Sequence, residues 1–317
     1  MKIGIVGAGM AGLACADALK CQGHDVALFD KGRGPGGRIS TRRIDTLLGE
    51  ASFDHGAQYF TARDPAFRQL VADWAARGLA TPWAPAGPDA WVGVPGMNAI
   101  VKDMADGHRL HESSLILGLT RLDRGWRLVG GERSADFFDA VVVAVPAEQA
   151  AALLGSQDLG LARQALMARS QPCWTAMFAL QAPLETPQLV LRDRGVIGWA
   201  ARNSAKPGRS GPETWVVQAN GAWSSEAIEA SSAWVGEQLL SALADALGLA
   251  VPAPIAAAAH RWRYALSAGI GGGSLWNPAL RLGVCGDWLV GPRIESAWLS
   301  GRALARAVEQ QPATLET

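Results

Sequence analysis

Three glycines near the amino terminus have the spacing of a phosphate-binding turn. Gly7, Gly9 and Gly12 follow an apolar run at 3–6 and precede a helical segment. We expect Gly7 to permit the tight turn, Gly9 to let the backbone approach a diphosphate, and Gly12 to let the helix lie close on the strand. A diphosphate placed there would meet the amides at the amino terminus of the helix.

An acid follows these glycines at the distance that a dinucleotide site requires. Asp30 ends a second apolar run, 25–29, about 20 residues beyond the turn. Its carboxylate is suited to accept hydrogen bonds from a ribose with free hydroxyls, and it would repel a 2′-phosphate. The ADP half of FAD or NAD therefore fits better than NADP, with Met10 and Ala11 at the start of the helix completing the predicted contacts.

A glycine-rich loop carries three cations directly after this acid. Lys31, Arg33 and Arg38 lie in the sequence Lys-Gly-Arg-Gly-Pro-Gly-Gly-Arg. So many glycines exclude regular structure, and paired glycines before an arginine favour a contact with phosphate. We therefore add Lys31, Arg33, Gly37 and Arg38 to the predicted cofactor site.

The elements that position these residues follow from periodicity. Residues 64–77 have a helical apolar stripe, with Asp64 as N-cap and a proline in the first turn. The segment 82–95 is predicted to be an ordered loop. Strands are expected at 114–119, 125–129 and 140–145, the last buried on both faces and followed by a helix at 148–154.

The composition shifts to tryptophan and β-type runs between about 160 and 278. Strands at 175–180, 188–191 and 214–219 with a helix at 233–247 predict an antiparallel sheet that covers the cofactor. The fold class is therefore α/β: a Rossmann-like dinucleotide-binding domain with a central parallel sheet, and a substrate domain on an antiparallel sheet with flanking helices. We predict a discontinuous FAD-binding domain (1–62, 93–158 and 279–317) and a substrate domain (63–92 and 159–278).

Composition excludes several classes of function. Lys and Arg total 29, as do Asp and Glu, so no net charge favours nucleic acid or an anionic membrane. The apolar amino terminus superficially resembles a secretory signal, but its glycines sit where a phosphate turn needs them. No apolar run is long enough for a membrane span. The four cysteines have no metal spacing and favour a reducing, cytoplasmic setting, and His108 and His111 lack partners for a metal site, so none is predicted.

Two further segments complete a pattern that resembles a known superfamily. The loop from Asp30 to Arg38 resembles the second FAD motif of flavin-containing amine oxidases. The stretch Asp-His-Gly-Ala-Gln-Tyr-Phe-Thr at 54–61 is similar to the segment that runs along the isoalloxazine ring in that superfamily, which implies cofactor contacts for His55, Gly56 and Ala57.

A strand at 281–284, then Gly-Asp and a helix to residue 308, resembles the carboxy-terminal FAD motif. The resemblance implies that Asp287 binds a ribityl hydroxyl. It also places the amides at the start of the helix, near Ile294 and Glu295, at the flavin N1 and C2 carbonyl, where the helix dipole stabilises negative charge. Three separated segments now point to non-covalent FAD, whereas NAD alone would explain only the first.

Within the superfamily the chain resembles the renalase group, especially its bacterial members. The resemblance implies an oxidase that takes a hydride from 1,2- or 1,6-dihydro isomers of NAD(P)H to flavin N5, releases NAD(P)⁺ and reduces O₂ to H₂O₂. Hydride transfer depends on positioning, so no acid–base residue is assigned. The predicted substrate contacts are Gln58, Tyr59, Phe60, Asn98 and Arg293.

Two alternatives remain open. The first is an amine oxidase or carotenoid-desaturase-like enzyme with another small donor. Many amine oxidases use a lysine near flavin N5, and Lys102 and Lys206 lie in segments that do not resemble that lysine's strand. The second is a flavin- or nucleotide-binding sensor without turnover, because hydride transfer leaves no signature of catalytic residues.

Overall fold

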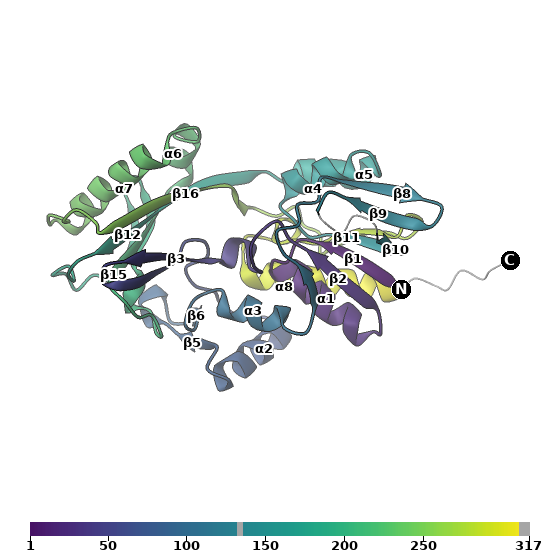
Figure 1. The fold of residues 1–317 in the computed structure, drawn as a ribbon, viewed down its shortest axis with the longest axis horizontal. Coiled ribbons are helices and arrows are strands. Elements are labelled where there is room, and N and C mark those ends of the chain that lie inside the picture. Colours follow the sequence, from purple (N-terminus) through teal and green to yellow (C-terminus); the bar gives the residue numbers. More distant parts are fainter. Residues whose placement is uncertain (132–135, 311–317) are drawn as a thin grey trace. The chain divides into compact units, whose positions relative to one another are not determined.

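A computed structural model describes residues 1–131 and 136–310. The chain forms two compact units (Figure 1). Unit 1 comprises Met1–Gly37, Val101–Ser170 and Ser267–Thr317, and unit 2 comprises Arg38–Ile100 and Gln171–Leu266. Compared with the predicted domain boundaries, residues 38–62 and 93–100 group with the second unit, and residues 159–170 and 267–278 group with the first.

Unit 1 is built on a six-stranded sheet in the order β17-β18-β11-β1-β2-β7. Strands β1 (Lys2–Val6), β2 (Asp25–Phe29), β7 (Arg109–His111), β11 (Ala140–Val143) and β18 (Leu282–Val284) are parallel, and β17 (Leu275–Asn277) is an antiparallel edge. Its central strands are buried along their length, as expected for a sheet covered on both faces. The predicted parallel sheet is confirmed.

Helices α1 (Met10–Cys21) and α8 (Ile294–Glu309) pack against each other in unit 1. A small sheet of β8 (Gly118–Leu122), β9 (Gly125–Val129) and β10 (Phe137–Phe138) adjoins α4 (Ala147–Leu154) and α5 (Leu159–Met167). The strand predicted at 114–119 is wrong: residues 112–117 lie outside the strands, and the chain pairs at β7 and at β8 instead. Of the three consecutive apolar residues there, Ile116 is buried, whereas Leu115 and Leu117 are exposed.

Unit 2 is built on an antiparallel five-stranded sheet in the order β13-β14-β15-β12-β16. Its strands are β13 (Val190–Arg194), β14 (Ile197–Arg202), β15 (Glu213–Ala219), β12 (Ser170–Leu180) and β16 (Ala256–Ser267). The predicted antiparallel sheet is therefore confirmed, although the sequence analysis missed β14 and β16. Helices α6 (Gly221–Glu226) and α7 (Ser232–Leu247) also belong to this unit.

The two faces of this sheet have different coverings. Helix α7 buries Val235, Leu239 and Leu243 in a core with Phe178 and Trp215. On the opposite face, the hairpin of β3 (Thr41–Thr46) and β4 (Gly49–Asp54) packs its Ala51 and Phe53 against Met177, Ala179 and Val216. The hairpin leads directly into the predicted flavin segment, so the face away from α7 is the one that carries it.

The remaining elements support that segment. Helix α2 (Pro65–Ala76) begins as predicted, because the Asp64 carboxylate accepts hydrogen bonds from the amides of Ala66 and Phe67. The predicted loop at 82–95 contains the 3-10 turn Ala84–Ala86 and strand β6 (Trp91–Gly93), which pairs with β5 (Ala80–Pro82). Helix α3 (Ala99–Ala105) follows and continues from unit 2 into unit 1.

Candidate functional site

The amino-terminal turn of unit 1 has the geometry of a phosphate site. A Cβ added at Gly12 would lie 2.0 Å from the Gly7 carbonyl oxygen, so only glycine allows α1 this close to β1. At Gly9, in contrast, an added Cβ meets no described heavy atom within 4 Å. Gly9 is the N-cap of α1, and no side chain among residues 1–131 and 136–310 caps it. The helix amides, those of Met10 and Ala11 among them, therefore suit an anionic ligand.

Asp30 lies beside this turn. Its Oδ2 accepts a hydrogen bond from the Ala8 amide at 2.7 Å, and its Oδ1 accepts one from the Gly32 amide at 2.7 Å. A carboxylate offers about four acceptor positions, so Asp30 retains capacity for ribose hydroxyls. The Gly36 amide donates to the Ala8 carbonyl, which brings the second predicted motif, with Gly37, against the first. Lys31 and Arg33 are exposed in this loop, and their cofactor contacts stay predictions.

The carboxy-terminal motif lies in the same unit. Asp287 is buried three residues after the end of β18, and its carbonyl accepts a hydrogen bond from the Gly291 amide at 2.6 Å. Helix α8 starts after the exposed Arg293, with Ile294 half-buried and Glu295 buried in its first turn. Because α1 follows β1 and α8 follows β18, both helix amino termini lie at the carboxyl edge of one parallel sheet. Unit 1 thus fits the dinucleotide and ribityl parts of FAD.

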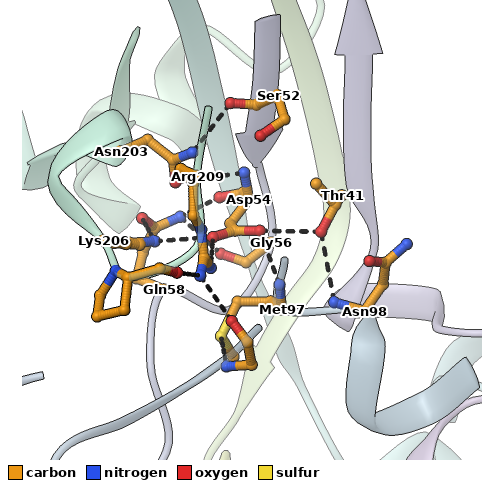
Figure 2. Close-up of polar contacts among 12 residues, drawn as sticks. Thr41, Ser52, Asp54, Gly56, Gln58, Met97, Asn98, Asn203, Lys206 and Arg209 are labelled. Atoms are coloured by element: carbon orange, nitrogen blue, oxygen red, sulfur yellow. Dashed lines mark hydrogen bonds and ion pairs between the residues drawn. The ribbon is translucent and has the colours of Figure 1, made fainter. Parts of the chain in front are cut away.

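Asp54 is the centre of a buried polar cluster in unit 2 (Figure 2). Its Oδ1 accepts hydrogen bonds from the Thr41 hydroxyl and the Met97 amide, each at 2.9 Å. Its Oδ2 pairs with both Lys206 and Arg209, whose side chains are at most 1% exposed. One carboxylate therefore faces two buried cations, and the cluster carries an excess positive charge.

These charges set the protonation of the cluster. Burial opposes ionisation of Asp54, but Lys206 and Arg209 outweigh it and lower the pKa of that carboxyl to about 2. Burial lowers the pKa of Lys206 to about 8, because the attraction of Asp54 is partly offset by repulsion from Arg209. At neutral pH, Asp54 is an anion and Lys206 is still a cation.

The cluster also fixes the backbone that follows Asp54. Lys206 donates to the Gln58 side-chain oxygen at 3.1 Å, and the Gln58 amide nitrogen donates to the carbonyls of Asp54 and Gly56. The Gly56 carbonyl accepts a second bond from Gln218 at 2.7 Å. Both donors of the Gln58 amide are thus used within the protein, so a substrate could reach only its oxygen.

Arg38, the last residue of the second predicted motif, lies against the same segment. Its carbonyl accepts a hydrogen bond from the Ala57 amide at 2.8 Å, and a Cβ added at Gly56 would lie 2.0 Å from that carbonyl oxygen. Its guanidinium donates to the Ala265 carbonyl at 3.0 Å. Unit 2 therefore joins the Arg38 backbone to Gly56 and Ala57. The phosphate contact of Arg38 and the flavin contacts of Gly56 and Ala57 stay predictions.

His55 belongs to an aromatic group on the same segment. Its ring stacks on Trp262 at 5.2 Å between centroids and meets His260 edge-on, also at 5.2 Å. Burial, with the charges of His260 and Arg42, lowers the pKa of His55 to about 4, and burial and Arg42 also lower the pKa of His260. The buried His55 Nδ1 has no partner among the described residues, so this neutral ring offers one polar atom for a ligand.

The remaining predicted substrate residues separate into different environments. Tyr59 is half-buried against Trp199 at 5.3 Å. Phe60 is buried in the core with Phe67 and Trp74 of α2, and Asn98 is buried beside Thr41. Their substrate contacts, like that of Arg293 in unit 1, stay predictions.

Sequence reasoning missed Lys206 and Arg209. Lys206 was set aside because its segment does not resemble a known strand, and the structure places it after the 3-10 turn Asn203–Ala205. The sequence shows two cations flanking the Pro-Gly turn at 207–208, but the burial of Asp54, which makes such partners necessary, is seen only in the structure.

The described residues contain no group of His, Cys, Asp or Glu that could hold a metal ion. His108 instead pairs with Asp17 at 2.7 Å, and His111 stacks on Phe29. Nor do these residues include a helix long and apolar enough to cross a membrane.

Comparisons with known proteins agree with this geometry. Residues 5–74 match the NAD(P)-binding Rossmann-like domain, and residues 85–309 match the flavin containing amine oxidoreductase family. Fold and site define a flavin-dependent oxidoreductase. The chain belongs to the flavin containing amine oxidoreductase family.

The individual proteins that resemble this chain are only distantly related to it. Over 56 residues the chain is 44% identical to a 4,4′-diapophytoene desaturase of Staphylococcus aureus (strain Newman), a match that spans 18% of this chain and 10% of that protein. The structure resembles cyclohexylamine oxidase from Brevibacterium oxydans IH-35A, with a TM-score of 0.69 and 14% identity over 97% of this chain and 98% of that chain. It also resembles putrescine oxidase bound to putrescine, with a TM-score of 0.67 and 14% identity over 98% and 100%. Such low identity establishes the fold alone.

Proposed function

We propose that this chain oxidises the 1,2- or 1,6-dihydro isomers of NAD(P)H, releasing NAD(P)⁺ and reducing O₂ to H₂O₂. The reaction balances when one proton is taken up for each hydride removed. FAD, when bound, supplies the chemistry by accepting the hydride and returning two electrons to oxygen. The protein must bind the donor flat, hold it in position and exclude water.

The observation that supports this donor is the excess positive charge beside the predicted flavin segment. Asp54 is the one acid of its cluster and faces two buried cations, while Arg42 acts on His55 and His260. A field of this sign repels an ammonium group and attracts the phosphates of a nucleotide. A pyridine nucleotide therefore matches the electrostatics of unit 2 better than a cationic amine does.

A second candidate is an oxidase of a small amine. It is favoured by the family to which the chain belongs and by the fold shared with cyclohexylamine oxidase and putrescine oxidase. An amine donor would have to shed its proton before hydride loss, and the neutral rings of His55 and the adjacent His260 could accept it.

Peroxide formation separates these candidates. The purified FAD-loaded protein is supplied in air with 1,2- and 1,6-dihydro-NAD(P), ordinary NADH, cyclohexylamine or putrescine. The proposed function predicts one H₂O₂ for each isomer molecule consumed and none above background with either amine. Peroxide from an amine alone would favour the second candidate, and peroxide from no donor would favour a sensor.

A further inference from the structure

One face of the unit 2 sheet carries a row of polar and aromatic side chains. In the strand register, Arg192 of β13 lies opposite Trp199 of β14, and Trp199 lies opposite Gln218 of β15. Residues directly opposed in an antiparallel sheet project from the same face. This is the face away from α7, since the neighbouring residues Leu191, Ala200 and Val217 point into the α7 core.

The inner end of the row holds the predicted flavin segment. Gln218 donates to the Gly56 carbonyl at 2.7 Å, and Tyr59 packs against Trp199 at 5.3 Å between ring centroids. Arg192 lies two strands away from Gln218, which corresponds to about 10 Å at the usual strand spacing. That separation is comparable to the length of a ribosyl phosphate attached to a ring at the segment.

The outer end of the row has unused hydrogen-bond donors. The Arg192 guanidinium lies 4.4 Å from the ring centroid of Trp199 and 5.8 Å from that of Tyr59, so two rings hold it in place. It donates to the Ala86 carbonyl, but a guanidinium has five N–H groups and Arg192 is exposed. The buried indole N–H of Trp199 has no hydrogen-bond partner within the described ranges.

We infer that Arg192, on the wall formed by Tyr59 and Trp199, binds the phosphate of the substrate's nicotinamide ribosyl phosphate. This inference rests on the proposed function and names the part of the substrate that the sheet recognises. Planar guanidinium groups bind phosphate oxygens in pairs, and the Trp199 N–H is a further donor along the same wall. Arg192 would thus act on substrate specificity rather than on hydride transfer.

The test compares donors with and without that phosphate. The 1,6-dihydro forms of nicotinamide mononucleotide and nicotinamide riboside are supplied to wild-type protein and to Arg192→Met. Wild-type kcat/KM is expected to favour the mononucleotide about tenfold, through KM. Arg192→Met is expected to reduce this preference to about twofold, because it lowers kcat/KM much more for the mononucleotide than for the riboside. Arg192→Lys, which keeps the cation, should retain part of the preference.

Arg194→Met is the matched control. Arg194 is an exposed arginine on the same strand, so its replacement removes the same charge from β13. It should keep the wild-type preference. Arg192→Met overturns the inference if it leaves the preference intact or lowers kcat/KM equally for both donors, since an equal loss indicates only a role in holding the Ala86 loop.

Ligand binding tests the phosphate site independently of turnover. Oxidised nicotinamide mononucleotide and riboside are titrated into each protein while tryptophan fluorescence is followed. We expect tighter binding of the mononucleotide to wild type and no difference for Arg192→Met. If wild type oxidises neither dihydro compound, the proposed function fails, and the titration alone then tests the phosphate site. Wild-type protein that binds the two ligands equally, or binds neither, overturns the assignment of Arg192 to the phosphate.

Discussion

Lys206 Nζ lies 3.2 Å from Asp54 Oδ2, and neither side chain is exposed to solvent. The pair joins residues 152 positions apart in the chain, and Arg209 contacts the same oxygen. Since Lys206 also holds Gln58, the charge of the cluster and the shape of the predicted flavin segment are set by the same side chains. Removing the anion and removing one of the cations should therefore change the free energy of unfolding by different amounts.

Asp54→Asn should destabilise the protein by about 3 kcal/mol, because it leaves two buried cations without their anion. Urea unfolding of the cofactor-free protein at pH 7 measures this loss. Asp73→Asn is the control: Asp73 pairs with Arg77 at the surface of α2, and its loss should cost less than about 0.5 kcal/mol. Equal losses for the two variants would contradict the described cluster.

Lys206→Met should cost at most about 1 kcal/mol at pH 7, because Asp54 keeps Arg209 and an apolar chain replaces a desolvated charge. The pKa of Lys206 falls from 10.5 to about 8 on folding. Between these values the unfolded chain holds a proton that the folded protein has released, so wild-type stability should rise with pH. Unfolding free energies measured at pH 8 and pH 10 should show this rise in wild type and not in Lys206→Met.

The lowered pKa of His55 predicts a loss of stability at acidic pH. Folding lowers its pKa from 6.5 to about 4, so the unfolded chain takes up the proton first as the pH falls. The contribution of the neutral His55 ring to the free energy of unfolding is complete above pH 6.5. It is lost progressively toward pH 4, by about 2 to 3 kcal/mol in total. In His55→Gln, the unfolding free energy should depend less on pH over this window. If the slope against pH is the same as in wild type, the pKa of His55 is not lowered in the folded protein.

Gly9 and Gly12 should separate cofactor binding from folding. A Cβ at Gly9 meets open space in the protein, whereas one at Gly12 lies 2.0 Å from the Gly7 carbonyl oxygen. Gly9→Ala should therefore fold normally but bind FAD at least about tenfold more weakly, because its methyl group stands where a phosphate must approach. Gly12→Ala should unfold or lose stability. Calorimetric FAD titration and thermal unfolding of both variants provide the measurements, and full FAD affinity in Gly9→Ala would place the phosphates elsewhere.

Local signals in the sequence were enough to predict the centre of the parallel sheet and the cofactor turn of unit 1. The turn from Gly7 to Gly12, the acid Asp30 and the buried run at 140–143 each act on near neighbours, so the parallel sheet and the cofactor turn followed from spacing. The strand predicted at 114–119 failed because a short apolar run does not identify its hydrogen-bonding partner.

The cluster in unit 2 depends on contacts that no spacing encodes. Asp54 ends a hairpin, while Lys206 and Arg209 follow a strand some 150 positions later, and their meeting requires the sheet register. Likewise, Arg192, Trp199 and Gln218 align only once β13, β14 and β15 are paired. Neither β14 nor this row was visible from periodicity, because a glycine and a register shift interrupt the alternation near Ile197.

The most direct test of the account is anaerobic mixing of the yellow FAD-loaded protein with single donors, followed by flavin absorbance. We expect rapid bleaching by the 1,2- or 1,6-dihydro isomers of NAD(P)H and a stable spectrum with amines. Rapid bleaching by an amine together with no response to either isomer would contradict the proposed substrate.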